Sequence, residues 1–144
     1  MKKLICVMAL VCIGILLVSC GSNRLDNPKA QFMRDFGLNI DKKDCVLEEL
    51  FNNYEGVSYE GIALYKLTVG EDVRQAFLQW ERFPLPEAAE NFLESLSAYA
   101  ELPSIADGYW KMVDRNPGTS AYTNVSLCVY DGATGAAYLL TMDI

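Results

Sequence analysis

Residues 122–142 read YTNVSLCVYDGATGAAYLLTM, and this stretch decides the fold. Apolar side chains alternate along residues 122–130, which is the two-residue period of a β-strand. DGATG at residues 131–135 is typical of a hairpin loop, and the apolar residues 136–142 follow it as a second strand. The stretch therefore predicts an antiparallel hairpin.

Three segments upstream of this hairpin also predict strands. Residues 109–114 form one, because the turn-rich RNPG at residues 115–118 separates them from the hairpin. Residues 59–69 are dense in β-branched and aromatic residues, and apolar side chains occupy both faces of the predicted strand. Residues 44–54 fit either a helical stripe or the first arm of a hairpin, and we favour the strand.

Apolar side chains at helical spacing predict helices between these strands. A short helix is expected between Pro28 and Gly37. A second helix follows Gly70, and a third ends at Pro103. The order of helix, two strands, two helices and three strands predicts a single α+β domain. We expect an antiparallel sheet of about five strands with two to three helices on one face.

Residues 1–19 have the pattern of a secretory signal peptide, with two lysines, an apolar run at residues 4–18 and a small-residue cleavage site. The run is shorter than the roughly 20 apolar residues of a membrane-spanning helix. The letters LVSC that end at Cys20 resemble the bacterial lipobox. This resemblance implies cleavage before Cys20 and a diacylglyceryl group on its thiol. The alternatives are a secreted protein cut near Ser19 and an uncleaved short anchor.

The predicted lipoprotein has three parts: a signal peptide at residues 1–19, a lipidated cysteine with a polar tether at residues 20–28, and a globular domain at residues 29–144. Two acyl chains of the palmitate type hold a protein stably in a membrane, whereas one chain binds only reversibly. We therefore expect the protein at the extracytoplasmic face of the cell membrane, with the lipid on Cys20 as its membrane contact.

The mature chain is strongly acidic. The signal peptide contains two of the 12 basic residues and none of the 19 acidic ones, so the remainder has a net charge of −9. Such a surface disfavours nucleic acid, because phosphate binding needs clustered lysine and arginine. The charge favours cationic partners instead. In the folded part, Cys45 and Cys128 remain, and we favour two buried thiols, with a Cys45–Cys128 disulfide as the alternative.

The chain contains no histidine, which excludes Ser-His-Asp and Cys-His catalysis and histidine-based zinc sites. The mature part has no C-x-x-C pair and no nucleotide-binding glycine motif, so we expect neither a metal nor a cofactor. Residues 131–135 supply one carboxylate where a calcium loop needs several. A carboxylate-only mechanism, as in glycosidases, stays open. Its candidate acids lie at strand ends or in turns: Asp107, Asp114, Asp131 and Asp143.

Aromatic residues offer a candidate interaction surface, because Tyr and Trp are enriched at interfaces. The candidates are Tyr109, Trp110 and Tyr122. Tyr109 and Trp110 are consecutive, so in a strand they point to opposite faces. Trp80 closes the apolar stripe of its helix and is expected in the core.

Three short motifs carry a resemblance over the region from Phe32 onward. They are Trp80 with Leu85-Pro86, then Gly108-Tyr109-Trp110 with Asp114-Arg115, and then Asn124-Val125, Tyr130-Asp131, Tyr138 and Asp143. Together they resemble a family of small uncharacterised proteins of Gram-positive bacteria, which share W…LP, GYY…DR and NF…YD…LY…D segments. The resemblance implies a common fold and no particular activity. Tyr54 and Ser58 stand where many of those relatives have histidines, so no role of such histidines applies to this chain.

These observations favour a membrane-anchored, non-enzymatic binding or accessory domain at the cell surface, whose ligand is a protein, a peptide or a wall component. One alternative is a small carboxylate-dependent hydrolase that acts on cell-wall glycans. Another is a structural subunit of a surface assembly.

Overall fold

The computed structural model describes residues 28–41, 44–54, 60–99, 101–118 and 123–144. The predicted signal peptide, Cys20, most of the tether and Tyr122 therefore lie outside the described residues. The elements in chain order are α2 (Pro28–Phe36), β1 (Val46–Asn52), β2 (Gly61–Thr68), α3 (Glu71–Phe77), β3 (Glu81–Arg82), α4 (Glu87–Leu96), β4 (Gly108–Asp114), β5 (Asn124–Asp131) and β6 (Ala136–Asp143). No helix within these ranges is long and apolar enough to cross a membrane.

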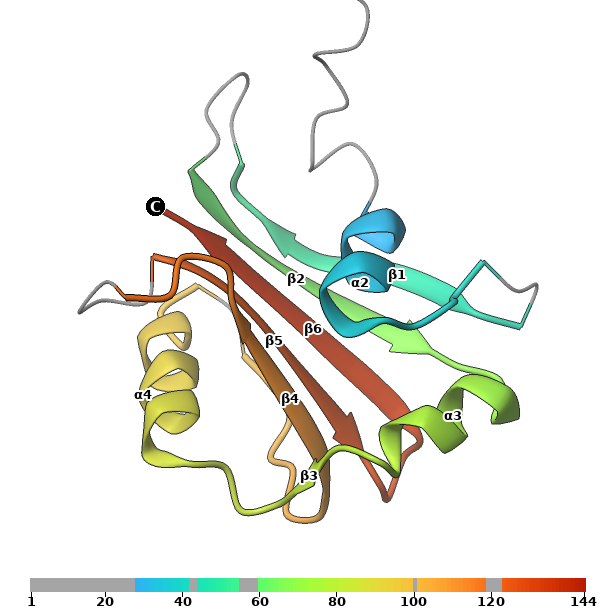
Figure 1. The fold of residues 1–144 in the computed structure, drawn as a ribbon. Helices are drawn as coiled ribbons and strands as arrows, with labels where there is room; N and C mark the ends of the chain where they lie inside the picture. The colour runs from blue at the N-terminus through green and yellow to red at the C-terminus, as the bar shows by residue number, and fades with distance from the viewer. Residues whose placement is uncertain (1–27, 42–43, 55–59, 100, 119–122) are drawn as a thin grey trace, which may run out of the picture.

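Six antiparallel strands form one open sheet in the described part of the chain, in the order β1-β2-β6-β5-β4-β3 (Figure 1). The predicted hairpin is confirmed: β5 and β6 pair directly, and Leu127 lies opposite Leu140. The loop between them closes through a hydrogen bond of 2.9 Å from the Gly135 N–H to the Asp131 carbonyl oxygen. Because β2 pairs with β6, the last strand lies in the middle of the sheet.

Both faces of the sheet are covered, which corrects the expectation of helices on one face. Phe32 of α2 and Phe77 of α3 are buried in a first core on one face of the sheet. Phe92 of α4 is buried in a second core on the other face. The adjacent strands β2, β6 and β5 carry apolar side chains on both sides, with Leu139 of β6 in the first core and Leu140 in the second. A sheet of this kind needs cover on both faces, so the helices divide between them.

The α+β class is confirmed, and residues 44–54 contain a strand. β1 is an edge strand whose pairing with β2 shifts between Glu49 and Phe51, as in a β-bulge. β3 is a sixth strand that was not predicted, because two residues are too few to show a period. Trp80 lies beyond the end of α3 and is half-buried against the first core, with its ring centroid 4.8 Å from that of Phe77.

Candidate functional site

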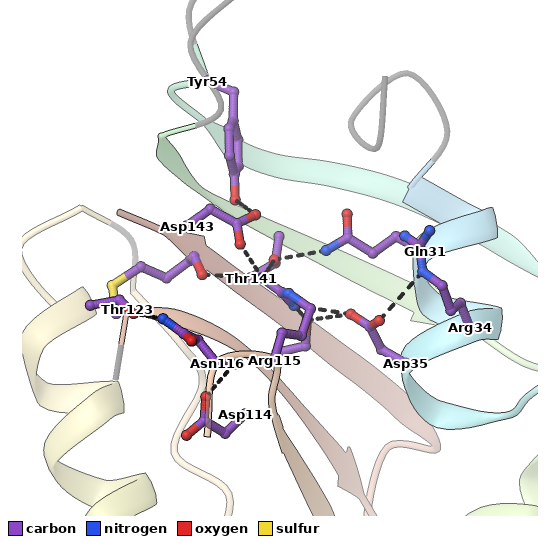
Figure 2. Close-up of polar contacts among 12 residues, drawn as sticks. Gln31, Arg34, Asp35, Tyr54, Asp114, Arg115, Asn116, Thr123, Thr141 and Asp143 are labelled. Atoms are coloured by element: carbon purple, nitrogen blue, oxygen red, sulfur yellow. Dashed lines mark hydrogen bonds and ion pairs between the residues drawn. The ribbon is translucent and has the colours of Figure 1, made fainter. Parts of the chain in front are cut away.

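A buried arginine lies between two carboxylates where α2 packs on the sheet (Figure 2). Arg115 follows β4, and its guanidinium donates to Asp35 of α2 at 3.0 Å and to Asp143 of β6 at 2.5 Å. The exposed fractions of these side chains are 6% for Arg115, 5% for Asp35 and 9% for Asp143. We call these three residues, with the neighbours described next, the Arg115 cluster.

Hydroxyl and amide groups surround the ion pairs of the Arg115 cluster. Ser126 donates to Asp35 at 2.7 Å, and Tyr54 donates to Asp143 at 3.1 Å. Gln31 donates to the Thr141 hydroxyl at 3.0 Å, and that hydroxyl also accepts from Arg115 at 3.2 Å. Burial, with the charge of Asp143 beside it, raises the pKa of the Tyr54 hydroxyl, which therefore stays a hydrogen-bond donor.

The Arg115 cluster joins α2 to the ends of β4, β5 and β6. Charges taken out of water stabilise a fold only when they are paired and hydrogen-bonded. Both terminal nitrogens of the Arg115 guanidinium are paired in this way, and its Nε atom is buried without a partner among the described residues. Figure 2 shows the polar atoms of Tyr54, Asp143, Arg115 and Asp35 directed at one another. The hydrogen bonds of Asp35 and Gln31 in this cluster therefore connect α2 to the sheet.

Sequence reasoning missed this cluster because it treated Arg115 as a turn residue. The available signal was in the first predicted helix, where Gln31 and Asp35 are four residues apart, each directly before a buried phenylalanine. Polar side chains at that spacing share one helix face. Their position beside the apolar stripe of Phe32 and Phe36 implies a buried partner on the sheet.

The four predicted acids do not meet in one cleft. Asp107 and Asp131 lie at one end of β4, because Gly108 pairs with Asp131. Asp114 and Asp143 lie at the opposite end, and there they point to opposite faces. Asp114 lies directly opposite Val125, so it is on the face of the second core. Asp143 follows Met142, which is in the second core, so its side chain points to the other face, where it binds Arg115. A glycosidase site needs two carboxyl groups about 5–10 Å apart. At the end shared by Asp107 and Asp131, the Asp107 carboxylate pairs with Arg82 and the Asp131 carboxylate accepts hydrogen bonds from its own loop.

Asp131 has a local role in the hairpin loop. Its carboxylate accepts from the Ala133 N–H at 2.9 Å and from the Thr134 hydroxyl at 2.6 Å. The hydrogen bond from Thr134 lowers the pKa of Asp131, with a smaller contribution from the backbone. Among the described residues, no group of three or more His, Cys, Asp or Glu side chains is placed to hold a metal ion.

We expect Thr134→Ala to lower the free energy of unfolding by about 1 kcal/mol at pH 7, because the hydrogen bond from the Thr134 hydroxyl to the Asp131 carboxylate is lost. A carboxyl group whose pKa is lowered by folding stabilises the protein above its unfolded pKa of about 3.9, and this contribution is lost as the pH falls. The difference between the two proteins should therefore shrink in acid. Urea unfolding across this pH range measures it, and Thr134→Ser, which keeps the hydroxyl, should resemble the original protein at every pH.

The two cysteines of the domain are buried and carry free thiols in the structure. Cys45 and Cys128 both lie in the first core. Burial raises the pKa of the Cys128 thiol well above its usual value, so this thiol stays protonated and packs as a small apolar group.

Tyr109 and Trp110 do not form one aromatic surface. Both are half-buried, but Tyr109 packs against the first core and Trp110 against the second. Trp110 also lines a shallow hollow at the sheet edge beside Trp80 and Lys111. The ammonium nitrogen of Lys111 lies 5.8 Å from the Trp80 ring centroid, within the range of a cation–π contact.

Two hollows that are open to solvent lie along one flank of α4. The hollows, of about 410 and 370 Å³, lie between this helix and the segment that returns toward β4. Most of the side chains that line the two hollows are apolar, and acidic side chains lie at their rim. The lining residues that matter here are Phe83, Leu85, Leu93, Leu102 and Ile105, with Glu90, Glu94 and Glu101 at the rim. We call this feature the α4 groove.

The fold and these sites define an α+β domain with a six-stranded antiparallel sheet in its described part, a buried ionic cluster under α2 and an open groove beside α4. Comparison of the chain with protein-family models, with curated proteins and with solved structures found no match.

Proposed function

We propose that this protein is a bacterial lipoprotein, held at the extracytoplasmic face of the membrane through a diacylglyceryl group on Cys20, and that its domain binds a partner without catalysing a reaction. The signal peptide and lipobox patterns of residues 1–20 support the anchor. A tether of eight residues or fewer spans at most about 28 Å, so the domain stays near the membrane.

The α4 groove is the observation that favours binding over chemistry. It is open to solvent, most of its lining side chains are apolar, and the hollow beside Leu93 and Leu102 is mainly apolar, as expected of a surface that accepts a partner. The best-organised charged groups, those of the Arg115 cluster, are instead buried and paired with one another. The hydrolase alternative has no such support, because Asp107 pairs with Arg82, Asp131 is hydrogen-bonded within its loop, and Asp114 and Asp143 lie on opposite faces of the sheet.

Cys20→Ala should release the protein from the membrane or leave it uncleaved, because the acceptor of the lipid is lost. Cell fractionation with an antibody to the domain measures this, and the variant should appear outside the membrane fraction or at the mass of the precursor. Cys12→Ala is the matched control, because it changes a cysteine of the same segment that is removed with the signal peptide. Equal membrane retention of a processed Cys20→Ala protein would contradict the anchor.

A structural subunit of a surface assembly is the second candidate, and β1 is the observation that favours it. This strand is at the edge of the sheet, and its Val46 and Leu50 side chains are 60% and 43% exposed. An open edge offers unpaired backbone groups to a strand of another chain. Light scattering of the purified protein tests this, since a strict monomer at all concentrations would count against self-assembly.

A further inference from the structure

We propose that the α4 groove binds a cationic amphipathic segment of a partner protein, with apolar side chains of that segment in the groove and lysine or arginine at its rim. This inference rests on the proposed function of a binding domain and names the surface and the chemistry of its ligand.

The geometry of α4 places the two hollows in line. Glu90, Glu94 and Ser97 follow one another at four and three residues, so they lie along one flank of the helix. The first hollow contains Glu90, and the second contains Glu94 and Ser97. Opposite them, Ile105 lines the first hollow and Leu102 the second. A peptide that lies parallel to α4 can therefore contact both hollows.

The charged residues that line the α4 groove are all acidic. From residue 83 to residue 110 the chain contains five acidic residues and no lysine or arginine. Arg82, at the border of this segment, already pairs with Asp107 at 3.4 Å. Glu90, Glu94 and Glu101 are exposed, and no basic side chain of the described residues pairs with them. The rim is therefore complementary to positive charge.

The negative charge of the rim disfavours a second copy of this chain, an anionic lipid surface and a nucleic acid as ligands of the groove. A second copy of this chain would bring an identical acidic rim, and like charges at close range are repelled. An anionic lipid surface or a nucleic acid would be repelled for the same reason. A segment in which lysine or arginine alternates with large apolar residues satisfies both the walls and the rim.

The test uses the full mature chain, purified in detergent, and a fluorescent peptide in which leucine and lysine recur at helical spacing. Fluorescence anisotropy should show saturable binding that weakens as salt is raised. The triple variant Glu90→Gln, Glu94→Gln and Glu101→Gln should raise the Kd about tenfold, because three rim charges are lost. The matched control variant Glu48→Gln, Glu71→Gln and Glu81→Gln makes the same charge change elsewhere and should leave the Kd within about twofold.

Three outcomes would overturn the inference. The first is no saturable binding, and the second is an equal loss in both triple variants, which would show attraction to net charge alone. The third is a dimer, seen by light scattering, that the groove variant dissolves. Thermal melts of both variants check that the fold is intact.

A photo-cross-linking residue placed at Leu102 and another at Leu50 of β1 separate this inference from the proposed function. If a partner is cross-linked in cells from Leu50 and not from Leu102, the domain binds its partner through β1, and the inference about the α4 groove is wrong while the proposed function stands. Cross-linking from Leu102 to a segment rich in lysine and arginine would support the groove. The proposed function itself fails if the protein is not anchored through Cys20, or if no partner is cross-linked from either position.

Discussion

Arg115→Met should lower the free energy of unfolding by about 3–5 kcal/mol, because it leaves the buried carboxylates of Asp35 and Asp143 without a counter-charge. Methionine keeps much of the side-chain volume, so the effect comes from the lost charge rather than from a cavity. Urea unfolding of the domain at pH 7, compared with the original protein, measures this difference.

Arg82→Met is the matched control for this prediction. Arg82 pairs with Asp107 at 3.4 Å, but the two side chains are 69% and 70% exposed. An exposed pair contributes about 0–1 kcal/mol, so the control should be nearly neutral. Adding Asp35→Asn and Asp143→Asn to Arg115→Met should restore part of the stability, because fewer unpaired charges are then buried. If Arg115→Met costs no more than Arg82→Met, the Arg115 cluster does not hold α2 on the sheet.

Gly108→Ala should also be strongly destabilising, by about 3 kcal/mol or more, because it overpacks a site bounded by backbone. A Cβ atom at Gly108 would lie 2.0 Å from the Tyr130 carbonyl oxygen, which belongs to the paired strand β5. Backbone in a sheet cannot rotate away as the end of a flexible side chain can. At this position β4 must therefore either shift its register on β5 or move away from it.

Gly132→Ala is the control for this second prediction. A Cβ atom there has the Asp107 carbonyl oxygen as its nearest neighbour at 3.4 Å, which is an ordinary van der Waals distance. Thermal unfolding of the two variants should give a large decrease in Tm for Gly108→Ala and a small change for Gly132→Ala. Similar Tm values for the two would show that β4 and β5 are not as close at Gly108 as the structure has them.

Much of the order of elements could be predicted from local pattern. Residues 122–142 alternate and turn within a few residues, so their hairpin needs no distant information. Residues 44–54 were ambiguous because their apolar spacing suits both a helix and a strand. Pairing of β1 with β2 decides between them, and that pairing depends on tertiary contacts rather than on local propensity.

The division of the helices and the Arg115 cluster depend on contacts between distant residues. Apolar side chains on both faces of residues 59–69 fit a covered strand, but local pattern predicted helices on one face only and does not show which helix covers which face. Arg115 is 80 residues from Asp35 and 28 from Asp143 in the sequence. No local spacing relates such positions, so the ion pairs appear only when the sheet is assembled. The α4 groove likewise needs the segment that returns from the helix.

The most direct test of the central claim is the intact mass of the protein extracted from bacterial membranes. The account predicts a chain that begins at Cys20 and carries the added mass of a diacylglyceryl group, while the Cys20→Ala variant lacks that species. A membrane-bound chain that begins at another residue, or one that carries no lipid, would contradict it.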